Sequence, residues 1–159
     1  MRIPARWCTY AIARFLFSMK LNFQYAQPTD APALAVLNRQ LIEDEGSRTR
    51  LTELQLADRM RGWLSNNYRA AIFESNGDTV AYALWRADGE DVYLRQFFVQ
   101  RPLRRHGLGR ECIDLLFTKV LAGKRIVLEV LTTNPGGLGF WKSVGFSEYA
   151  VTLEKTIAG

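Results

Sequence analysis

The chain has 159 residues and a formal net charge of +5 at pH 7, with 48% hydrophobic and 12% aromatic residues. This length and composition predict one domain with its own core, and they exclude an intrinsically disordered chain and a spanning helix, which needs about 18 consecutive apolar residues. The positive charge favours an anionic partner, and nucleic acid, a membrane surface and a phosphorylated cofactor all fit charge alone.

Residues 1–18 differ from the rest of the chain. They contain no acidic side chain, and the first one in the sequence is that of Asp30. Arg14 interrupts their apolar part, so they match a secretory signal poorly. We expect residues 1–18 to be an N-terminal extension outside the domain, with a basic targeting segment as the alternative. The domain is then expected to occupy residues 19–159.

Two helices follow a strand-like segment, LNFQYA (21–26). Thr29 and Asp30 suit an N-cap, and leucines at positions 34, 37 and 41 recur at helical spacing to about Asp44. After a polar link, Thr52 and Gln55 are spaced as a capping box. The apolar face of the second helix consists of Leu56, Met60, Trp63 and Leu64.

The next predicted elements are strands joined by tight turns. RAAIFES (69–75) and TVAYALWRA (79–87) flank Asn76-Gly77-Asp78, a strong hairpin signal, and a second turn leads into DVYLRQFFVQ (91–100). A helix opens after the arginine-rich stretch that follows. RIVLEVLT (125–132) is a predicted strand, PGGLGFWKSVG (135–145) a short helix and FSEYAVTLEKT (146–156) a closing strand. This order predicts a single α/β domain with a mixed sheet and helices on its faces.

The stretch from Arg104 to Gly109 joins a strand to a helix and gathers arginines, the only histidine and two glycines. The first turn of a helix has unpaired N–H groups at the positive end of its dipole, and glycines let a ligand approach the backbone. Arginines add charge-assisted hydrogen bonds. The stretch therefore predicts a cradle for an anion such as a pyrophosphate, with a solvated basic turn as the alternative.

Two motifs carry a resemblance to a known family. The pattern Val99-(x)4-Arg104-x-x-Gly107-x-Gly109 resembles the coenzyme A signature of the GCN5-related N-acetyltransferases (GNAT). About 25 residues on, LEVLTTNPGGLGFWKSVGF resembles that family's second signature. The resemblance runs from about Leu21 to the C-terminus. It implies a GNAT-like, mostly antiparallel mixed sheet with splayed central parallel strands and helices on both faces.

The resemblance also implies where acetyl-CoA, the cosubstrate, binds. The pantetheine arm and the acetyl thioester are expected between the strand of Phe97, Phe98 and Val99 and the strand of residues 128–131. Backbone groups of Phe97 and Val99 would contact the arm and Asn134 would hold it from the other side, while the N–H groups of Arg105 to Arg110 would hold the pyrophosphate. The expected cofactor-binding residues are Phe97, Phe98, Val99, Arg104, Arg105, His106, Gly107, Leu108, Gly109, Arg110, Asn134 and Trp141.

Acetyl transfer to an amine needs a base and a source of a proton for the thiolate. Glu129 lies where several family members carry the base, and a solvent-facing strand glutamate is the alternative. Gln96 stands where members often have glutamate, so that second base is missing. Trp141 stands where many family members have the tyrosine that acts as the general acid, and an indole cannot supply a proton at neutral pH. Either Trp141 only packs and water protonates the thiolate, which we favour, or Tyr93 or Tyr149 serves.

The acceptor is indicated only weakly. Glu43, Asp44 and Glu45 lie in the link that commonly lines the acceptor cleft in this family, where they would attract a cationic amine. A solvated helix end is the alternative. Three aromatic residues could form an apolar wall there or belong to the core: Tyr82, Trp85 and Tyr93.

The sequence thus predicts an acetyl-CoA-dependent N-acetyltransferase domain over residues 19–159, acting on the amine of a small molecule or of a peptide or protein. A non-catalytic CoA-binding regulatory domain is the alternative. A nucleic-acid partner is not expected, because the arginines gather on one turn instead of a face, and no membrane partner is expected. Cys8 and Cys112 have neither metal spacing nor a disulfide framework, so we expect a cytoplasmic protein without a metal. The acceptor and the oligomeric state, including a homodimer, stay open.

Overall fold

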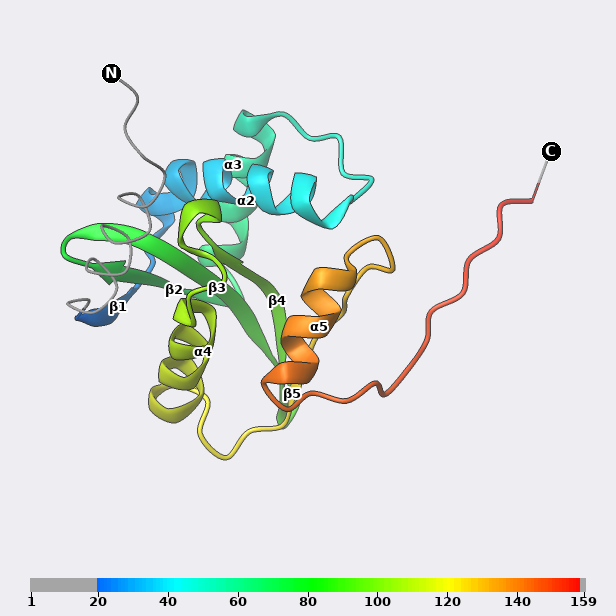
Figure 1. Ribbon diagram of the computed structural model, residues 1–159. Helices are drawn as coiled ribbons and strands as arrows, with labels where there is room; N and C mark the ends of the chain where they lie inside the picture. The colour runs from blue at the N-terminus through cyan, green and yellow to red at the C-terminus, as the bar shows by residue number, and fades with distance from the viewer. Residues whose placement is uncertain (1–19, 158–159) are drawn as a thin grey trace, which may run out of the picture.

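The computed structural model describes residues 20–157, so the predicted extension of residues 1–18 lies outside the described part of the chain (Figure 1). A sheet of five strands is combined with four α-helices and two short 3-10 helices in this part. The elements in chain order are β1 (Leu21–Tyr25), η1 (Pro28–Asp30), α2 (Ala31–Glu45), α3 (Glu53–Leu64), β2 (Tyr68–Ser75), β3 (Asp78–Asp88), β4 (Asp91–Val99), η2 (Arg101–Leu103), α4 (Leu108–Lys119), β5 (Ile126–Val127) and α5 (Pro135–Ser143).

The strands follow one another through the sheet in the order β1-β2-β3-β4-β5. All neighbours are antiparallel except β4 and β5, which are parallel. The β2–β3 hairpin turns at Asn76 and Gly77, whose φ angles of 53° and 87° are the left-handed values that this tight turn requires. The predicted hairpin is therefore confirmed, as is the α/β fold with a mixed sheet.

Helices cover both faces of the sheet (Figure 1). Successive strand residues point to opposite faces, so Tyr82 and Leu84 of β3 pack with α2 and α3, whereas Ala83 and Trp85 pack with α4. The capping box of Thr52 and Gln55 forms as predicted at the start of α3. No helix in residues 20–157 has the length and apolar character that crossing a membrane requires.

The parallel pair β4–β5 separates soon after it starts. Only Val92 with Ile126 and Tyr93 with Val127 are paired, so β5 has two residues instead of the predicted eight. A β-bulge in β4 adds twist at this point, because Leu94 and Gln96 pair with adjacent residues of β3 and leave Arg95 without a partner there. Beyond Tyr93 the edge of β4 has no neighbouring strand among the described residues.

The closing strand predicted over residues 146–156 is wrong for this structure. From residue 146 to residue 157 the chain has no regular secondary structure and runs away from the sheet (Figure 1). Tyr149, Val151 and Leu153, the alternating apolar residues behind the prediction, are more than 80% exposed. Such alternation needs a neighbouring strand to become a sheet edge, and the two residues of β5 are too short a template.

Candidate active site

The turn before α4 presents a row of free backbone donors. Arg105 and Gly107 have left-handed φ angles of 68° and 86°, which turn the chain sharply before the helix. None of the six successive N–H groups from Arg105 to Arg110 donates to an acceptor within the described residues. The turn leads directly into the N-terminus of α4, a helix of twelve residues. The positive end of the helix dipole therefore lies at these N–H groups. The turn suits an anion with several oxygens, such as a pyrophosphate.

The two glycines of this turn have different surroundings. A Cβ added at Gly107 would meet nothing within 4 Å, so its space is open. A Cβ added at Gly109 would lie 3.2 Å from Cε2 of Phe140 and 3.5 Å from Cγ2 of Val99. Gly107 therefore keeps the approach to the backbone clear, whereas Gly109 allows α4 to pack closely on α5 and β4.

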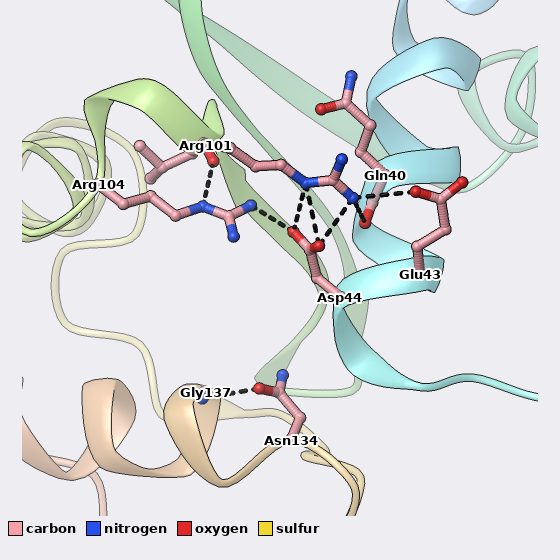
Figure 2. Close-up of polar contacts among 8 residues, drawn as sticks. Gln40, Glu43, Asp44, Arg101, Arg104, Asn134 and Gly137 are labelled. Carbon is pink, nitrogen blue, oxygen red and sulfur yellow. Dashed lines mark hydrogen bonds and ion pairs between the residues drawn. The ribbon is translucent and has the colours of Figure 1, made fainter.

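Most arginines of this stretch hold neighbouring elements in place. Arg104 donates from Nε to the carbonyl of Val99 at 2.8 Å, and its Nη2 lies 2.7 Å from Asp44 (Figure 2). Arg101, which the sequence analysis did not single out, pairs with both Glu43 and Asp44. Arginine pairs across 57 positions or more leave no trace in a local sequence pattern, so this clamp could not be foreseen.

Three more side chains complete the description of this turn: those of Arg105, His106 and Arg110. Arg110 donates from Nη2 to the carbonyl of Ser143 at 2.7 Å and thereby gives this carbonyl, at the C-terminus of α5, a hydrogen-bond partner. Arg105 and His106 are exposed, and neither side chain contacts a polar partner in the described part of the chain. Both side chains are therefore free to contact a ligand.

The three acidic residues at the end of α2 are not equivalent. Burial alone would raise the pKa of Asp44, but the hydrogen bonds and charges of Arg101 and Arg104 outweigh it and hold that pKa below its ordinary value. Glu45 has no arginine partner within residues 20–157, and burial together with the charge of Asp44 raises its pKa. Glu45 is thus the member of the trio whose carboxylate is unpaired.

The loop before α5 and α5 itself lie beside the edge of β4 that β5 leaves unpaired. Asn134 caps α5, its Oδ1 accepting from the N–H of Gly137 at 2.9 Å (Figure 2). A Cβ at Gly137 would lie 2.4 Å from Nδ2 of Asn134, so only glycine leaves room for the cap. The Nδ2 group has no acceptor in the described residues and can donate to a ligand. Thr133 closes this loop onto α2 by donating to the carbonyl of Glu45 at 2.5 Å.

Aromatic rings from β4 and α5 pack beside this loop. Phe97 and Phe140 are stacked at a centroid distance of 5.7 Å, and Trp141 contacts both rings as well as Phe146. The indole N–H of Trp141 makes no hydrogen bond to a described residue. These contacts favour the interpretation in which Trp141 packs. Phe98, Val99 and Leu108 are buried beside the cradle.

Glu129 meets a tyrosine on the neighbouring strand. The hydroxyl of Tyr93 donates to Oε2 of Glu129 at 3.1 Å, across the point where β4 and β5 begin to separate. Burial, followed by the charge and the hydrogen bond of Glu129, raises the pKa of Tyr93 to about 12. The phenol therefore stays protonated near neutral pH and orients the exposed carboxylate. Sequence analysis named both residues but could not predict that they pair.

The other aromatic candidates divide between core and solvent. Tyr82 and Trp85 are buried in the two core clusters, which favours the core interpretation for both. The hydroxyl of Tyr82 donates to Oε1 of Gln96 at 3.1 Å. The side chain of Gln96 therefore has a hydrogen-bond partner on the face of the sheet that α2 and α3 cover. Tyr149 is 83% exposed and contacts Arg125.

Comparisons with known proteins identify the family. The family model described as the acetyltransferase (GNAT) family matches residues 35–146. No match was found among curated protein sequences. Among solved structures, a predicted acetyltransferase with acetyl-CoA from Clostridium acetobutylicum is similar, with 19% identity, a TM-score of 0.67 and coverage of 86% of this chain and 96% of that one.

Two further solved structures have the same fold. An acetyltransferase from Thermus thermophilus shares 20% identity at a TM-score of 0.69, over 82% of this chain and 88% of that one. A ribosomal-protein-alanine N-acetyltransferase from Brucella melitensis biovar Abortus 2308 shares 15% identity at a TM-score of 0.67, over 86% and 99%. Such identities support the fold alone, but the family model covers more than half of the sequence. The chain belongs to the acetyltransferase (GNAT) family.

Proposed function

We propose that the protein is an acetyl-CoA-dependent N-acetyltransferase that acts on the amine of a small molecule or of a peptide or protein. The observation that carries the proposal is the row of six N–H groups from Arg105 to Arg110, none of which has an acceptor within residues 20–157. It lies at the start of α4, next to the end of β4 from which β5 has separated. A pyrophosphate on the row would leave the attached arm free to follow the open edge of β4.

The residues around the gap fit a thioester cosubstrate with a phosphorylated end. The turn and the free side chains of Arg105 and His106 would hold the pyrophosphate, and Gly107 would let it reach the backbone. The edge of β4 from Phe97 to Val99 would contact the arm, and Nδ2 of Asn134 would donate to it from the opposite side. Acetyl-CoA supplies an acetyl group that is already activated as a thioester.

The chain's own contribution to the reaction is the movement of protons. An ammonium group must lose a proton before its nitrogen can attack, and Glu129 would accept that proton. Tyr93 would position the carboxylate through its 3.1 Å hydrogen bond. Because the thiol of the leaving group has an ordinary pKa of about 8.5, water can protonate its thiolate. Trp141 would only pack against Phe97 and Phe140.

The variant Glu129→Gln tests this assignment. It keeps the size of the side chain but cannot accept a proton, so acetyl-CoA affinity measured by calorimetry should stay unchanged. The transfer rate should fall about 10²-fold or more, and the loss should shrink at high pH, where more of the amine is neutral. Tyr93→Phe should cost less, because the carboxylate remains. Trp141→Phe is the matched control and should stay close to the parent.

A non-catalytic CoA-binding domain is the second candidate, because the indole of Trp141 replaces an acidic tyrosine. It makes the opposite prediction for turnover. The full chain should bind acetyl-CoA, yet no amine in a broad panel of small amines and peptides should release free thiol above the hydrolysis background. Release that depends on the amine and disappears in Glu129→Gln would reject this candidate.

A further inference from the structure

Two arginines on the α3 side of the sheet share one tryptophan. The guanidinium carbons of Arg59 in α3 and of Arg95 in β4 each lie 4.7 Å from the ring centroid of Trp63. Within residues 20–157, neither guanidinium has a carboxylate oxygen within 4.0 Å. Seven other described arginines have a carboxylate partner: Arg39, Arg48, Arg61, Arg86, Arg101, Arg104 and Arg125.

Arg59 is half-buried and incompletely hydrogen-bonded. Its Nη2 donates to Oδ1 of Asn38 at 3.0 Å, but its buried Nε has no acceptor in the described part of the chain. Burial and, after it, the charge of Arg95 lower the pKa of Arg59. Cation–π contact of both guanidinium groups with the ring of Trp63 offsets part of the electrostatic repulsion between Arg59 and Arg95. An anion that reaches both guanidinium groups through their exposed N–H groups would offset the rest of that repulsion.

The β-bulge explains why Arg95 faces this side. Strict alternation would send neighbouring residues of β4 to opposite faces of the sheet. Instead, Arg95 has no partner on β3 and contacts Trp63, while the next residue, Gln96, contacts Tyr82, which packs with α2 and α3. Two polar side chains in succession thus point towards the same helices. Bulges often redirect a side chain in this way beside an active site.

An aromatic surface connects this arginine pair with Glu129. Arg95 lies 6.0 Å from the ring of Tyr68, and Arg86 bridges Tyr68 and Tyr93 at 5.9 Å and 5.4 Å. Tyr93 in turn donates to Glu129. An acceptor whose amine reaches Glu129 would therefore extend along this surface towards Arg95 and Arg59.

We propose that Arg59 and Arg95 bind a carboxylate of the acceptor, so that the substrates are amines that also carry a carboxylate, such as an amino acid or a peptide. The inference rests on the function proposed above. Guanidinium groups match a carboxylate with paired N–H···O bonds, and their contacts with the ring of Trp63 restrict where they lie. The pairing of Glu43 and Asp44 with arginines agrees with this proposal. Because both carboxylates are already paired, they are not free to bind an acceptor that carries a second positive charge in place of a carboxylate.

Matched acceptors test the proposal. Each amino acid or short peptide is compared with its amide and with the corresponding amine that lacks the carboxyl group, using acetyl-CoA and thiol release. A phosphorylated amine is tested as well, to compare a phosphate with a carboxylate. The full chain should prefer the carboxylate form in kcat/KM by about tenfold or more, mainly through KM. A preference for the phosphorylated amine, or none between acid and amide, would overturn the proposal.

Variants locate the preference on the two arginines. Arg95→Gln, at an exposed position, should abolish the preference by lowering kcat/KM for the carboxylate form to the value for the amide, while acetyl-CoA affinity stays unchanged. Arg59→Gln should act likewise if it folds. Arg69→Gln is the matched control, since Arg69 is exposed on β2 without an ion pair in the described residues, and it should keep the preference. An Arg95→Gln variant that still distinguishes acid from amide would disprove the assignment.

A binding measurement separates failure of this inference from failure of the enzymatic function. With CoA present, calorimetry compares an N-acetylated amino acid with its N-acetylated amide. If no amine is acetylated but the acid still binds about tenfold more tightly than the amide, and Arg95→Gln removes the difference, the anion site stands without the proposed reaction. Equal binding of both compounds would refute the anion site whatever the turnover.

Discussion

Neighbouring residues at the end of α2 show how one contact changes the behaviour of a carboxylate. Asp44 and Glu45 are adjacent in sequence, yet the pKa of Asp44 lies below its ordinary value and that of Glu45 above. Arg101 and Arg104 reach Asp44, whereas no cation in the described residues reaches Glu45. Both carboxylates lie at the negative end of the helix dipole, where a charge is unfavourable unless it is paired.

The stability of the protein should rise when Glu45 is replaced by glutamine. A raised folded-state pKa means that folding opposes ionisation, so the carboxylate destabilises the fold once the pH rises above its ordinary value of 4.5. Glu45→Gln should therefore add about 0.3–1 kcal/mol to the free energy of unfolding at pH 7, the range for a charge at a helix end. Below pH 4.5 the difference should vanish. Urea unfolding at several pH values measures both.

Asp44→Asn is the opposing control for this prediction. The pKa of Asp44 is lowered, so its contribution is present above its ordinary value of 3.8 and is lost as the pH falls through the folded-state value. The variant should thus be less stable than the parent at pH 7 and approach it in acid. If Glu45→Gln were also less stable at pH 7, an unrecognised cation would have to pair with Glu45.

At the scale of elements, the arginine-rich stretch connects the helices around the proposed cofactor site. Arg101 and Arg104 attach it to the end of α2, and Arg110 attaches the start of α4 to the end of α5. The turn between them keeps its backbone N–H groups free. The side chains therefore fix the geometry of the turn, and the backbone supplies most of the donors for an anion.

The two glycines of the turn should respond differently to valine. Gly107→Val places a side chain in open space at a left-handed φ of 86°, so it should block the backbone and lower acetyl-CoA affinity about tenfold or more, with a moderate loss of stability from strain. Gly109→Val would push against Phe140, 3.2 Å from its Cβ, and should lower the melting temperature more. Calorimetry and thermal unfolding measure the two effects. Unchanged affinity in folded Gly107→Val would remove the cradle assignment.

Local patterns predicted the elements whose form depends on nearby residues. The hairpin at Asn76-Gly77 and the capping box at Thr52 follow from turn and cap chemistry over four residues or fewer. The turn before α4 was predictable for the same reason, since a strand, two glycines and a helix start lie within one stretch. Contacts between distant residues were not predictable: Arg101 meets Asp44 across 57 positions and Tyr93 meets Glu129 across 36. Which acids are paired and which are free depends on those contacts.

At the scale of the whole molecule, the gap beside β4 divides the sheet from the last part of the chain. Phe97 of β4 packs on Phe140 and Trp141 of α5, and Tyr93 donates to Glu129. Two further contacts join the α2 region to the last part of the chain: Thr133 donates to the carbonyl of Glu45, and Arg48 pairs with Glu154. Beyond α5, Phe146 still packs on Trp141 and Phe117. The residues after it that the structure describes, 147–157, contribute no buried side chain.

Removing residues 147–159 distinguishes a packed closing strand, as the sequence pattern predicts, from the exposed irregular segment that the structure shows. The described part of this segment loses only surface contacts, those of Glu148 with Lys142, Tyr149 with Arg125 and Glu154 with Arg48. Exposed contacts of this kind contribute little, so the melting temperature should stay within about 4 °C of that of the full chain. Acetyl-CoA affinity should also be unchanged, because residues 147–157, the described part of the segment, do not contact the turn before α4.

The predicted closing strand would give a different result. If Tyr149, Val151 and Leu153 pack as one side of a strand, each contributes about 1.5–3 kcal/mol of burial. The truncated chain would then melt at least about 10 °C lower. Val151→Lys in the full chain separates loss of packing from an effect of chain length. With Val151 81% exposed, the substitution should leave the melting temperature unchanged, whereas in a packed strand it would bury an unpaired charge and lower it as truncation does.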